Sequence, residues 1–237
     1  PYPKVFDIKP EMGSVGGGTR VLVTGWMFID SPGLVCQFGA SIVSAHFISE
    51  DEITCFTPES QHVGLVDFKV GINGYQVMEE GLNFTYYGHV QFSMVYPLYG
   101  SVLGGTNIVI EATNLINVGP EIPRLSCRIG NHVVPAQNRN DSILCISPKV
   151  DTYGVAMIAI SLNGQDYHYA NGELIFTYLQ VPIVTEFSPM SIMVGTTDII
   201  LKTLNMPELP PTDIYCSFSS LGQQLQKDNN KDVASFL

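Results

Sequence analysis

The segment GSVGGGTRVLVTG, residues 13–25, places three consecutive glycines in front of an alternating apolar run. Glycine-rich loops hold nucleotide phosphates when a helix begins directly after them and a Lys-Ser or Lys-Thr pair is present. Here a strand-like run follows, and the segment contains no lysine. The sequence therefore favours the corner of a β-sheet, where glycine permits positive φ, over a nucleotide site.

Other side chains that often catalyse reactions or bind metals lack the spacing that such sites need. The five histidines are scattered, without the spacing of a zinc site. His168 lies near Asp166 and Glu173, but we interpret this segment as the solvated flank of a hairpin because it has no repeated counterpart. The acidic pairs Asp51-Glu52 and Glu79-Glu80 lack the alternating oxygen ligands of a calcium loop. We predict no enzymatic activity, no cofactor and no metal site.

The charge balance argues against two classes of partner. The 237 residues include 11 Lys and Arg against 22 Asp and Glu, which gives a formal net charge of −11. Binding to nucleic acid or to an anionic membrane surface depends on clustered cations, and the chain contains no such cluster. No apolar run is long enough to span a bilayer. We expect no nucleic-acid partner and no direct membrane insertion within this segment.

The opening segment recurs along the chain. PEMGSVGGGTRVLVTG begins at Pro10, PLYGSVLGGTNIVIEAT begins at Pro97, and a weaker copy, PMSIMVGTTDIILKTL, begins at Pro189. In each copy a proline precedes a glycine-containing turn and a threonine, and a run with apolar residues at alternate positions follows. Alternation of this kind is typical of a half-buried strand.

Later segments of the repeat recur in the same order. LVCQFG at Leu34 corresponds to LSCRIG at Leu125 and IYCSFS at Ile214. Asn73-Gly74 and Asn163-Gly164 each lie between strand-like runs, which predicts a two-residue hairpin turn. About seven short strands in roughly 90 residues describe a small antiparallel sandwich.

The ordered motifs of the first repeat resemble the IPT/TIG domain family, immunoglobulin-like modules of the type found in plexins and the hepatocyte growth factor receptor. The family pattern is Pro, Gly, Gly-Gly-Thr, an alternating strand and Gly, then Cys-x-Phe-Gly, a second Cys followed by Pro, and Phe-x-Tyr. The matching residues are Pro10, Gly13, Gly17, Gly18, Thr19, Gly25, Cys36, Phe38, Gly39, Cys55, Pro58, Phe84 and Tyr86.

The second repeat resembles the same family, with Ala112 in place of the last glycine of the strand. The resemblance implies an all-β chain of tandem immunoglobulin-like antiparallel β-sandwiches of the IPT/TIG, E-set type. Two sandwiches are expected to be complete, over residues 1–88 and 89–180, and residues 181–237 to hold the first strands of a third. The matching residues are Pro97, Gly100, Gly104, Gly105, Thr106, Cys127, Gly130, Cys145, Pro148, Phe176 and Tyr178.

Four of the five cysteines occupy equivalent positions in the two complete repeats. Cys36 and Cys55 lie 19 positions apart, and Cys127 and Cys145 lie 18 apart. Two neighbouring strands of a sandwich bring such pairs within bridging distance, so we predict one disulfide per domain in an oxidising compartment. The alternative is four buried free thiols. Cys216 is predicted to be unpaired because Ser235 stands where its partner would be.

Three surface features indicate an extracellular protein with partners. Asn140 begins an Asn-x-Ser sequon in a polar stretch that reads as an exposed loop, and Asn83 begins an Asn-x-Thr sequon at the start of a strand, so both are predicted N-glycosylation sites. Trp26, the single tryptophan, follows the first alternating strand. It either joins the core together with Phe28 or forms a surface for a protein partner or a glycan.

The third repeat is about half as long as the others, which leaves two interpretations. Either the chain continues past Leu237, or a neighbouring chain completes the half-domain through its open edge in a head-to-tail contact that builds a fibre. The joints between repeats are short, and short joints predict stiff, end-to-end domains.

The function predicted from these observations is that of an extracellular or cell-surface structural or interaction protein. It would be a secreted or surface-bound rigid array of IPT/TIG domains that associates with copies of itself, as a fibre for example, or with another surface protein. The alternative is an ectodomain segment of a plexin-like adhesion or signalling receptor. A third class is an accessory module of a polysaccharide-acting enzyme. A DNA-binding factor is disfavoured by the shortage of Lys and Arg.

Overall fold

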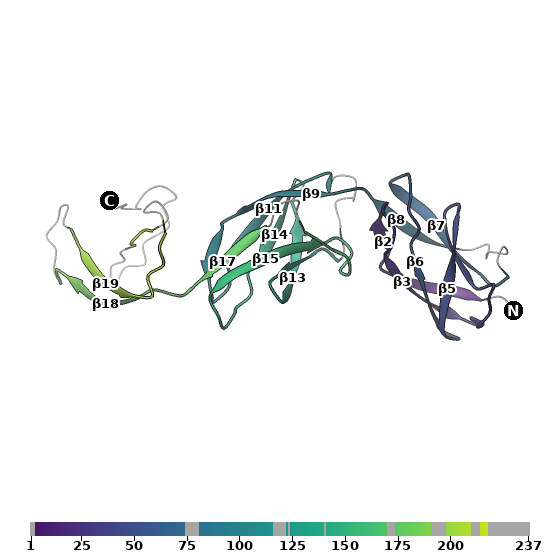
Figure 1. Ribbon diagram of the computed structural model, residues 1–237, viewed down its shortest axis with the longest axis horizontal. Coiled ribbons are helices and arrows are strands. Elements are labelled where there is room, and N and C mark those ends of the chain that lie inside the picture. Colours follow the sequence, from purple (N-terminus) through teal and green to yellow (C-terminus); the bar gives the residue numbers. More distant parts are fainter. Residues whose placement is uncertain are drawn as a thin grey trace, which may run out of the picture. The chain divides into compact units, whose positions relative to one another are not determined.

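The computed structural model describes residues 3–73, 81–115, 122, 124–139, 141–169, 174–190, 198–209 and 214–217. The chain divides into two compact units, Pro1–Leu179 and Gln180–Leu237 (Figure 1). The regular elements of both are β-strands. The first unit holds two sandwiches, and the second holds a two-stranded sheet. The predicted all-β fold of tandem immunoglobulin-like sandwiches is confirmed.

The first sandwich is one continuous sheet folded into two layers, in the strand order β1-β3-β6-β5-β4-β7-β8-β2. The strand β5 connects the layers because its first half pairs with β4 and its second half with β6. The strands are β1 (Lys4–Lys9), β2 (Met12–Ser14), β3 (Arg20–Trp26), β4 (Val35–Phe38), β5 (Ser41–Ser49), β6 (Glu52–Phe56), β7 (Gly64–Gly71) and β8 (Leu82–Tyr87).

The second sandwich repeats this arrangement, in the order β10-β17-β15-β12-β13-β14-β11-β9, with β16 paired to β15. Here β13 connects the layers by pairing first with β12 and then with β14. The strands are β9 (Gln91–Tyr96), β10 (Tyr99–Ser101), β11 (Asn107–Thr113), β12 (Ser126–Ile129), β13 (His132–Asn138), β14 (Ser142–Ile146), β15 (Gly154–Ser161), β16 (Tyr167–His168) and β17 (Ile175–Leu179).

Alternation along the strands builds the two cores. In β3, Val21 and Val23 are fully buried, whereas Arg20 at the start of the strand is exposed. In β11, Ile108 and Ile110 occupy the equivalent inward positions. Burial of such side chains contributes roughly 1.5–3 kcal/mol each, so these alternating residues supply much of the driving force for packing the two layers.

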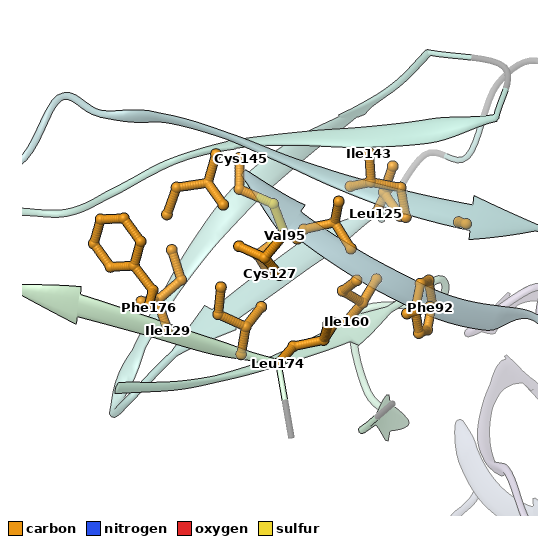
Figure 2. Packing of buried hydrophobic residues seen from close by; sticks show 14 of the residues in the cluster. Phe92, Val95, Leu125, Cys127, Ile129, Ile143, Cys145, Ile160, Leu174 and Phe176 are labelled. Carbon is orange, nitrogen blue, oxygen red and sulfur yellow. A yellow bond between two sulfur atoms is a disulfide. The ribbon is translucent and has the colours of Figure 1, made fainter. Parts of the chain in front are cut away.

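A disulfide joins the two layers at the centre of each sandwich. Cys36 on β4 is bonded to Cys55 on β6, with Cα atoms 6.4 Å apart, and Cys127 on β12 is bonded to Cys145 on β14, with Cα atoms 6.3 Å apart. All four are buried. Figure 2 shows the second pair among the surrounding aliphatic side chains. The bonded strands face each other across the sandwich instead of lying side by side in one layer.

The glycines of the opening segment form a corner of the sheet. Gly17 and Gly18 have φ values of 72° and 79°, and the amide of Gly18 donates to the Thr57 carbonyl oxygen over 2.8 Å. A Cβ on Gly17 would lie 2.8 Å from that same oxygen. Gly104 and Gly105 repeat the conformation in the second sandwich. Positive φ and close backbone approach both require glycine here.

The second unit, Gln180–Leu237, repeats the first strand pair of each sandwich. The strands β18 (Ile183–Ser188) and β19 (Ile200–Leu204) are antiparallel, with a bulge at Thr185. Bulges at Phe6 and Ser93 interrupt the equivalent pairs β1–β3 and β9–β11. The third copy therefore repeats a structural detail of the other two as well as their sequence.

Other expectations for the third repeat are met only in part. Residues 214–217 are described but are not assigned to a strand, although the motif IYCSFS predicts one. Cys216 in this stretch is half-buried and is not disulfide-bonded. Ser235 lies outside the described residues. Phe187 is 54% exposed, whereas the equivalent Ile8 and Val95 are buried.

Replacing Gly17 with alanine is expected to destabilise the first sandwich by about 2 kcal/mol or more, because the new Cβ meets backbone atoms and the residue must keep positive φ. Urea unfolding would measure the loss. Gly16→Ala is the matched control, since a Cβ at that position meets only the Ser14 hydroxyl at 3.6 Å. Equal stability of the two variants would contradict the proposed role of the corner.

The disulfide assignment predicts a thiol count. Alkylation of the unfolded, unreduced chain should label one cysteine, Cys216, and alkylation after reduction should label all five. Intact-mass spectrometry distinguishes the two states, and peptide mapping identifies the labelled position. Labelling at Cys36 or Cys127 before reduction would instead support buried free thiols.

Candidate functional site

The aromatic residues after β3 divide between core and surface. Trp26 ends this strand and is 54% exposed, whereas Phe28 is buried in the first sandwich. Met27 between them has a φ of 62°, which turns the chain sharply at this point. Phe6, in the bulge of the neighbouring strand β1, is also exposed. Trp26 is therefore available at the surface, and its use by a partner remains a proposal.

Of the two sequons, the structure describes only the one on β8. Asn83 is exposed and lies opposite Asp67 of β7, on the outer face of the first sandwich. Thr85, the hydroxyl residue of this sequon, is half-buried on the same face. Asn140 lies outside the described residues. The Asn83 side chain is therefore accessible, and its glycosylation stays a prediction.

The two sandwiches of the first unit share a hydrophobic cluster at their junction. Tyr87, the last residue of β8, is only 2% exposed and belongs to the core cluster of the second sandwich, which also contains Phe92 and Leu162. Met12 on the neighbouring strand β2 packs against the same cluster. Three residues, 88–90, connect β8 to β9. The first sandwich therefore supplies part of the core of the second.

Asn163 is the polar centre of this junction. It is 1% exposed, and its amide nitrogen Nδ2 donates to the carbonyl oxygen of Met12 over 3.1 Å and to Asp166 Oδ2 over 2.8 Å. Its Oδ1 accepts from the amides of Gln165 and Asp166 and from the hydroxyl of Ser161. The same side chain thus organises its own loop and also hydrogen-bonds to the first sandwich.

The predicted two-residue turn at Asn163-Gly164 is wrong, because the loop is longer than two residues. The pairing of β15 with β16 ends at Ser161 and Tyr167, which leaves a five-residue loop, 162–166. The Asn163 side chain supplies the turn contacts that backbone pairing would otherwise make. In the first repeat, Gly74 lies outside the described residues, so the prediction for Asn73-Gly74 is not tested there.

Asp166 connects this loop to the other sandwich. The buried Thr19 hydroxyl donates to Asp166 Oδ2 over 2.6 Å, and Asn163 donates to the same oxygen. Hydrogen bonds to an ionised carboxylate are shorter and stronger than those between neutral groups. The Gly-Gly-Thr motif therefore serves two purposes in the first repeat, as the sheet corner and as a donor to the second sandwich.

His168 completes the junction beside Tyr87. Its Nε2 lies 3.2 Å from the Tyr87 hydroxyl, and the two rings meet edge to face with centroids 6.2 Å apart. Burial lowers the pKa of His168; Asp166 opposes this effect, and His89 adds to it. Burial, with the nearby Asp166, raises the pKa of Tyr87. The expectation of a solvated hairpin flank is therefore wrong for His168, because its half-buried ring contacts Tyr87 of the first sandwich.

Sequence reasoning missed the junction because its contacts are remote along the chain. Thr19 and Asp166 are 147 positions apart. A comparison of the repeats offered one signal. Asp166 lies three positions after Asn163, whereas the first repeat has Gln76 three positions after Asn73. The neighbouring acidic residue Glu173 and the pair Glu79-Glu80 lie outside the described residues.

The junction is suited to fixing an orientation. Within the described residues, no three His, Cys, Asp or Glu side chains gather in a way that could hold a metal ion. The described part of the chain also includes no helix with the length and apolar character to cross a membrane. What the junction combines is a shared apolar cluster, two hydrogen bonds between sandwiches and a Tyr–His contact.

Comparisons with known proteins agree with this architecture. The family model of the IPT/TIG domain matches residues 3–86. Human Plexin-A3 is 28% identical over 211 residues, which covers 85% of this chain and 11% of the plexin. Human Fibrocystin-L is 27% identical over 217 residues, which covers 86% of this chain and 5% of the relative.

A solved structure of the full extracellular region of Plexin A4 has the same fold. The match has a TM-score of 0.53 at 22% identity and covers 89% of this chain and 18% of the plexin chain. The chain thus spans about a tenth of the length of the plexin relatives that it matches.

Asn163→Ala is expected to destabilise the second sandwich by about 2–3 kcal/mol, because the carbonyl of Met12 and the loop amides lose their partner in a buried place. Urea unfolding measures the loss, and faster hydrogen exchange in residues 82–90 would show that the junction has loosened. Gln165→Ala, at an exposed position of the same loop, should change stability by no more than about 0.5 kcal/mol. A similar effect of both substitutions would contradict the central role of Asn163.

Proposed function

We propose that this chain, which is built of tandem IPT/TIG domain repeats, is an extracellular interaction segment of a receptor-type surface protein. In this role its first two sandwiches act as one stiff body that sets the direction of the domains attached to it. The observation that carries the proposal is the junction, where Tyr87 enters the core of the neighbouring sandwich and Asp166 accepts from Thr19. A flexible tether would need neither contact.

The comparisons support a surface location and protein partners. The relatives include plexins, and the similar solved structure is a plexin extracellular region. The paired cysteines and the exposed sequon at Asn83 are features of proteins that pass through an oxidising compartment. We propose the receptor segment in preference to a self-assembling fibre, because the relatives are long chains of which this one matches a small part.

The segment acts by binding and positioning in this proposal, without catalysis. Its partner is a protein, either another surface protein or a second copy of the same receptor. Trp26 is the residue we propose for contact, because it is the exposed aromatic side chain at the end of β3. Large aromatic side chains at the surface are frequent anchors of protein interfaces. A covalent N-glycan at Asn83, and another at Asn140, complete the proposed surface.

We further propose the domain limits 1–88, 89–180 and 181–237, with only the first strands of a third sandwich in the last range. The bulge shared by β1, β9 and β18 supports this assignment. So does the exposure of Phe187, which occupies a position that is buried in both complete sandwiches.

The proposal is tested on the protein in the cells that make it. An antibody against residues 1–179 should label intact cells, and removal of N-glycans should reduce the apparent mass of the labelled protein. Labelling that requires permeabilised cells would contradict the surface location. An unchanged mass would contradict only the glycans.

The positioning role needs a separate comparison in the full-length protein. Asn163→Ala and Gln165→Ala are compared at equal amounts of surface protein, and only Asn163→Ala should weaken binding of, or signalling by, the cognate partner. If Trp26→Ala abolishes binding while Asn163→Ala leaves it intact, the segment is a docking surface and its stiffness has no role.

A further inference from the structure

The junction between the first two sandwiches contains several titratable groups. His168 and Asp166 come from the second sandwich, Tyr87 from the first, and His89 from the connection between them. Apolar packing and the Asn163 hydrogen bonds already join the sandwiches. Histidine is the side chain whose charge changes near neutral pH. The contact between the two sandwiches can therefore depend on pH.

We propose that the junction is an acid-sensitive joint, in which proton uptake by His168 loosens the contact between the first two sandwiches as the pH falls below neutral. The inference rests on the coupled sandwiches of the proposed function and adds a condition under which they separate. It requires no ligand, because the groups that respond are residues of the joint itself.

The geometry explains why the neutral form of the ring suits the docked state. When the proton of neutral His168 is on Nδ1, its Nε2 accepts the hydrogen bond from the Tyr87 hydroxyl, 3.2 Å away. A protonated ring carries hydrogen on both nitrogens, so Nε2 can no longer accept. Tyr87 is 2% exposed, which keeps its hydroxyl from turning freely to water. Protonation therefore removes the acceptor of a buried donor.

The groups around His168 shift its pKa in opposite directions. Asp166 favours the protonated ring, but its carboxylate already accepts from Thr19 and Asn163. His89 disfavours the protonated form of His168. Partial burial of the ring is the largest influence and favours the neutral form.

Two arginines among the described residues also lie near this hairpin. Arg124 lies beside Gly164 in its loop, and Arg128 lies against Tyr167. The guanidinium of Arg128 lies over the ring of Tyr167, 3.8 Å from its centroid. Tyr167 and His168 are consecutive residues of β16 and therefore point to opposite faces of the strand. Arg128 stays paired with its ring whichever charge His168 carries.

Linkage fixes the direction of the pH effect. In the docked state the pKa of His168 is below its ordinary value of 6.5, and separation returns the ring to water and its pKa toward that value. The separated state therefore binds more protons, and docking weakens as the pH falls from about 6.5 through the docked pKa. Each unit by which docking lowers the pKa changes the docking equilibrium about tenfold.

Residual dipolar couplings of the full chain test this inference. Amides of β3–β8 and of β11–β15 report the alignment of the first and second sandwich separately. At pH 7.5 the two sets should fit one alignment tensor, and at about pH 5 they should require two. The ring signal of His168 should titrate with a midpoint below 6.5.

His168→Gln keeps an acceptor beside Tyr87 but cannot be protonated, so its sandwiches should share one tensor at both pH values. His132→Gln, at an exposed position of β13 remote from the junction, should behave like the unmodified chain. The unmodified chain is compared with both variants under identical conditions.

The failures of the two proposals are distinguishable. One shared tensor for the unmodified chain at both pH values overturns the acid-sensitive joint and leaves the coupled sandwiches intact. Two tensors at pH 5 in His168→Gln as well assign the loosening to another group and overturn the role of His168. Two tensors already at pH 7.5 contradict the coupling itself, and with it the proposed function. A His168 midpoint at or above 6.5 also overturns the inference.

Discussion

Burial of the Tyr87 side chain is the interaction on which the first unit of this chain depends. The residue ends the last strand of one sandwich, yet its ring completes the apolar core of the next. Apolar surface shared in this way is lost to water if the sandwiches separate, so it favours one arrangement of the pair over many. The hydrogen bonds of Asn163 and Asp166 then select the orientation, because each needs its partner at a specific point on the first sandwich.

A comparison of the two sandwiches separates the features that they share from those that belong to one of them. The glycine corner and the disulfide between layers occur in both sandwiches, at equivalent positions. In both sandwiches these features hold two layers of strands around a small core. The loop that carries Asn163 and Asp166 is different, since the first repeat has Gln76 in place of the aspartate. A contact between domains is thus built on an otherwise repeated frame.

In the proposed function, the contact between the first two sandwiches determines how stiff this part of the chain is. The stiffness of a multidomain surface protein depends on its joints more than on its domains, since each domain is already rigid. Here the joint combines a strong apolar contact with groups whose protonation alters a buried hydrogen bond. In the proposed function, the same few residues fix how the first two sandwiches are oriented at neutral pH and loosen that contact in acid.

The sequence by itself determined the repeat, the all-β class, the inward strand residues and the glycine corner, because these follow from local periodicity and backbone sterics. The order of the motifs resembles that of IPT/TIG domains, and this resemblance predicted the immunoglobulin-like sandwiches. Only the tertiary structure decided that Trp26 is exposed while Phe28 is buried, and that His168 lies at a junction. The pair Thr19 and Asp166 shows the reason. Neither residue has a local partner that marks it, and their hydrogen bond exists only because two separately folded sandwiches meet.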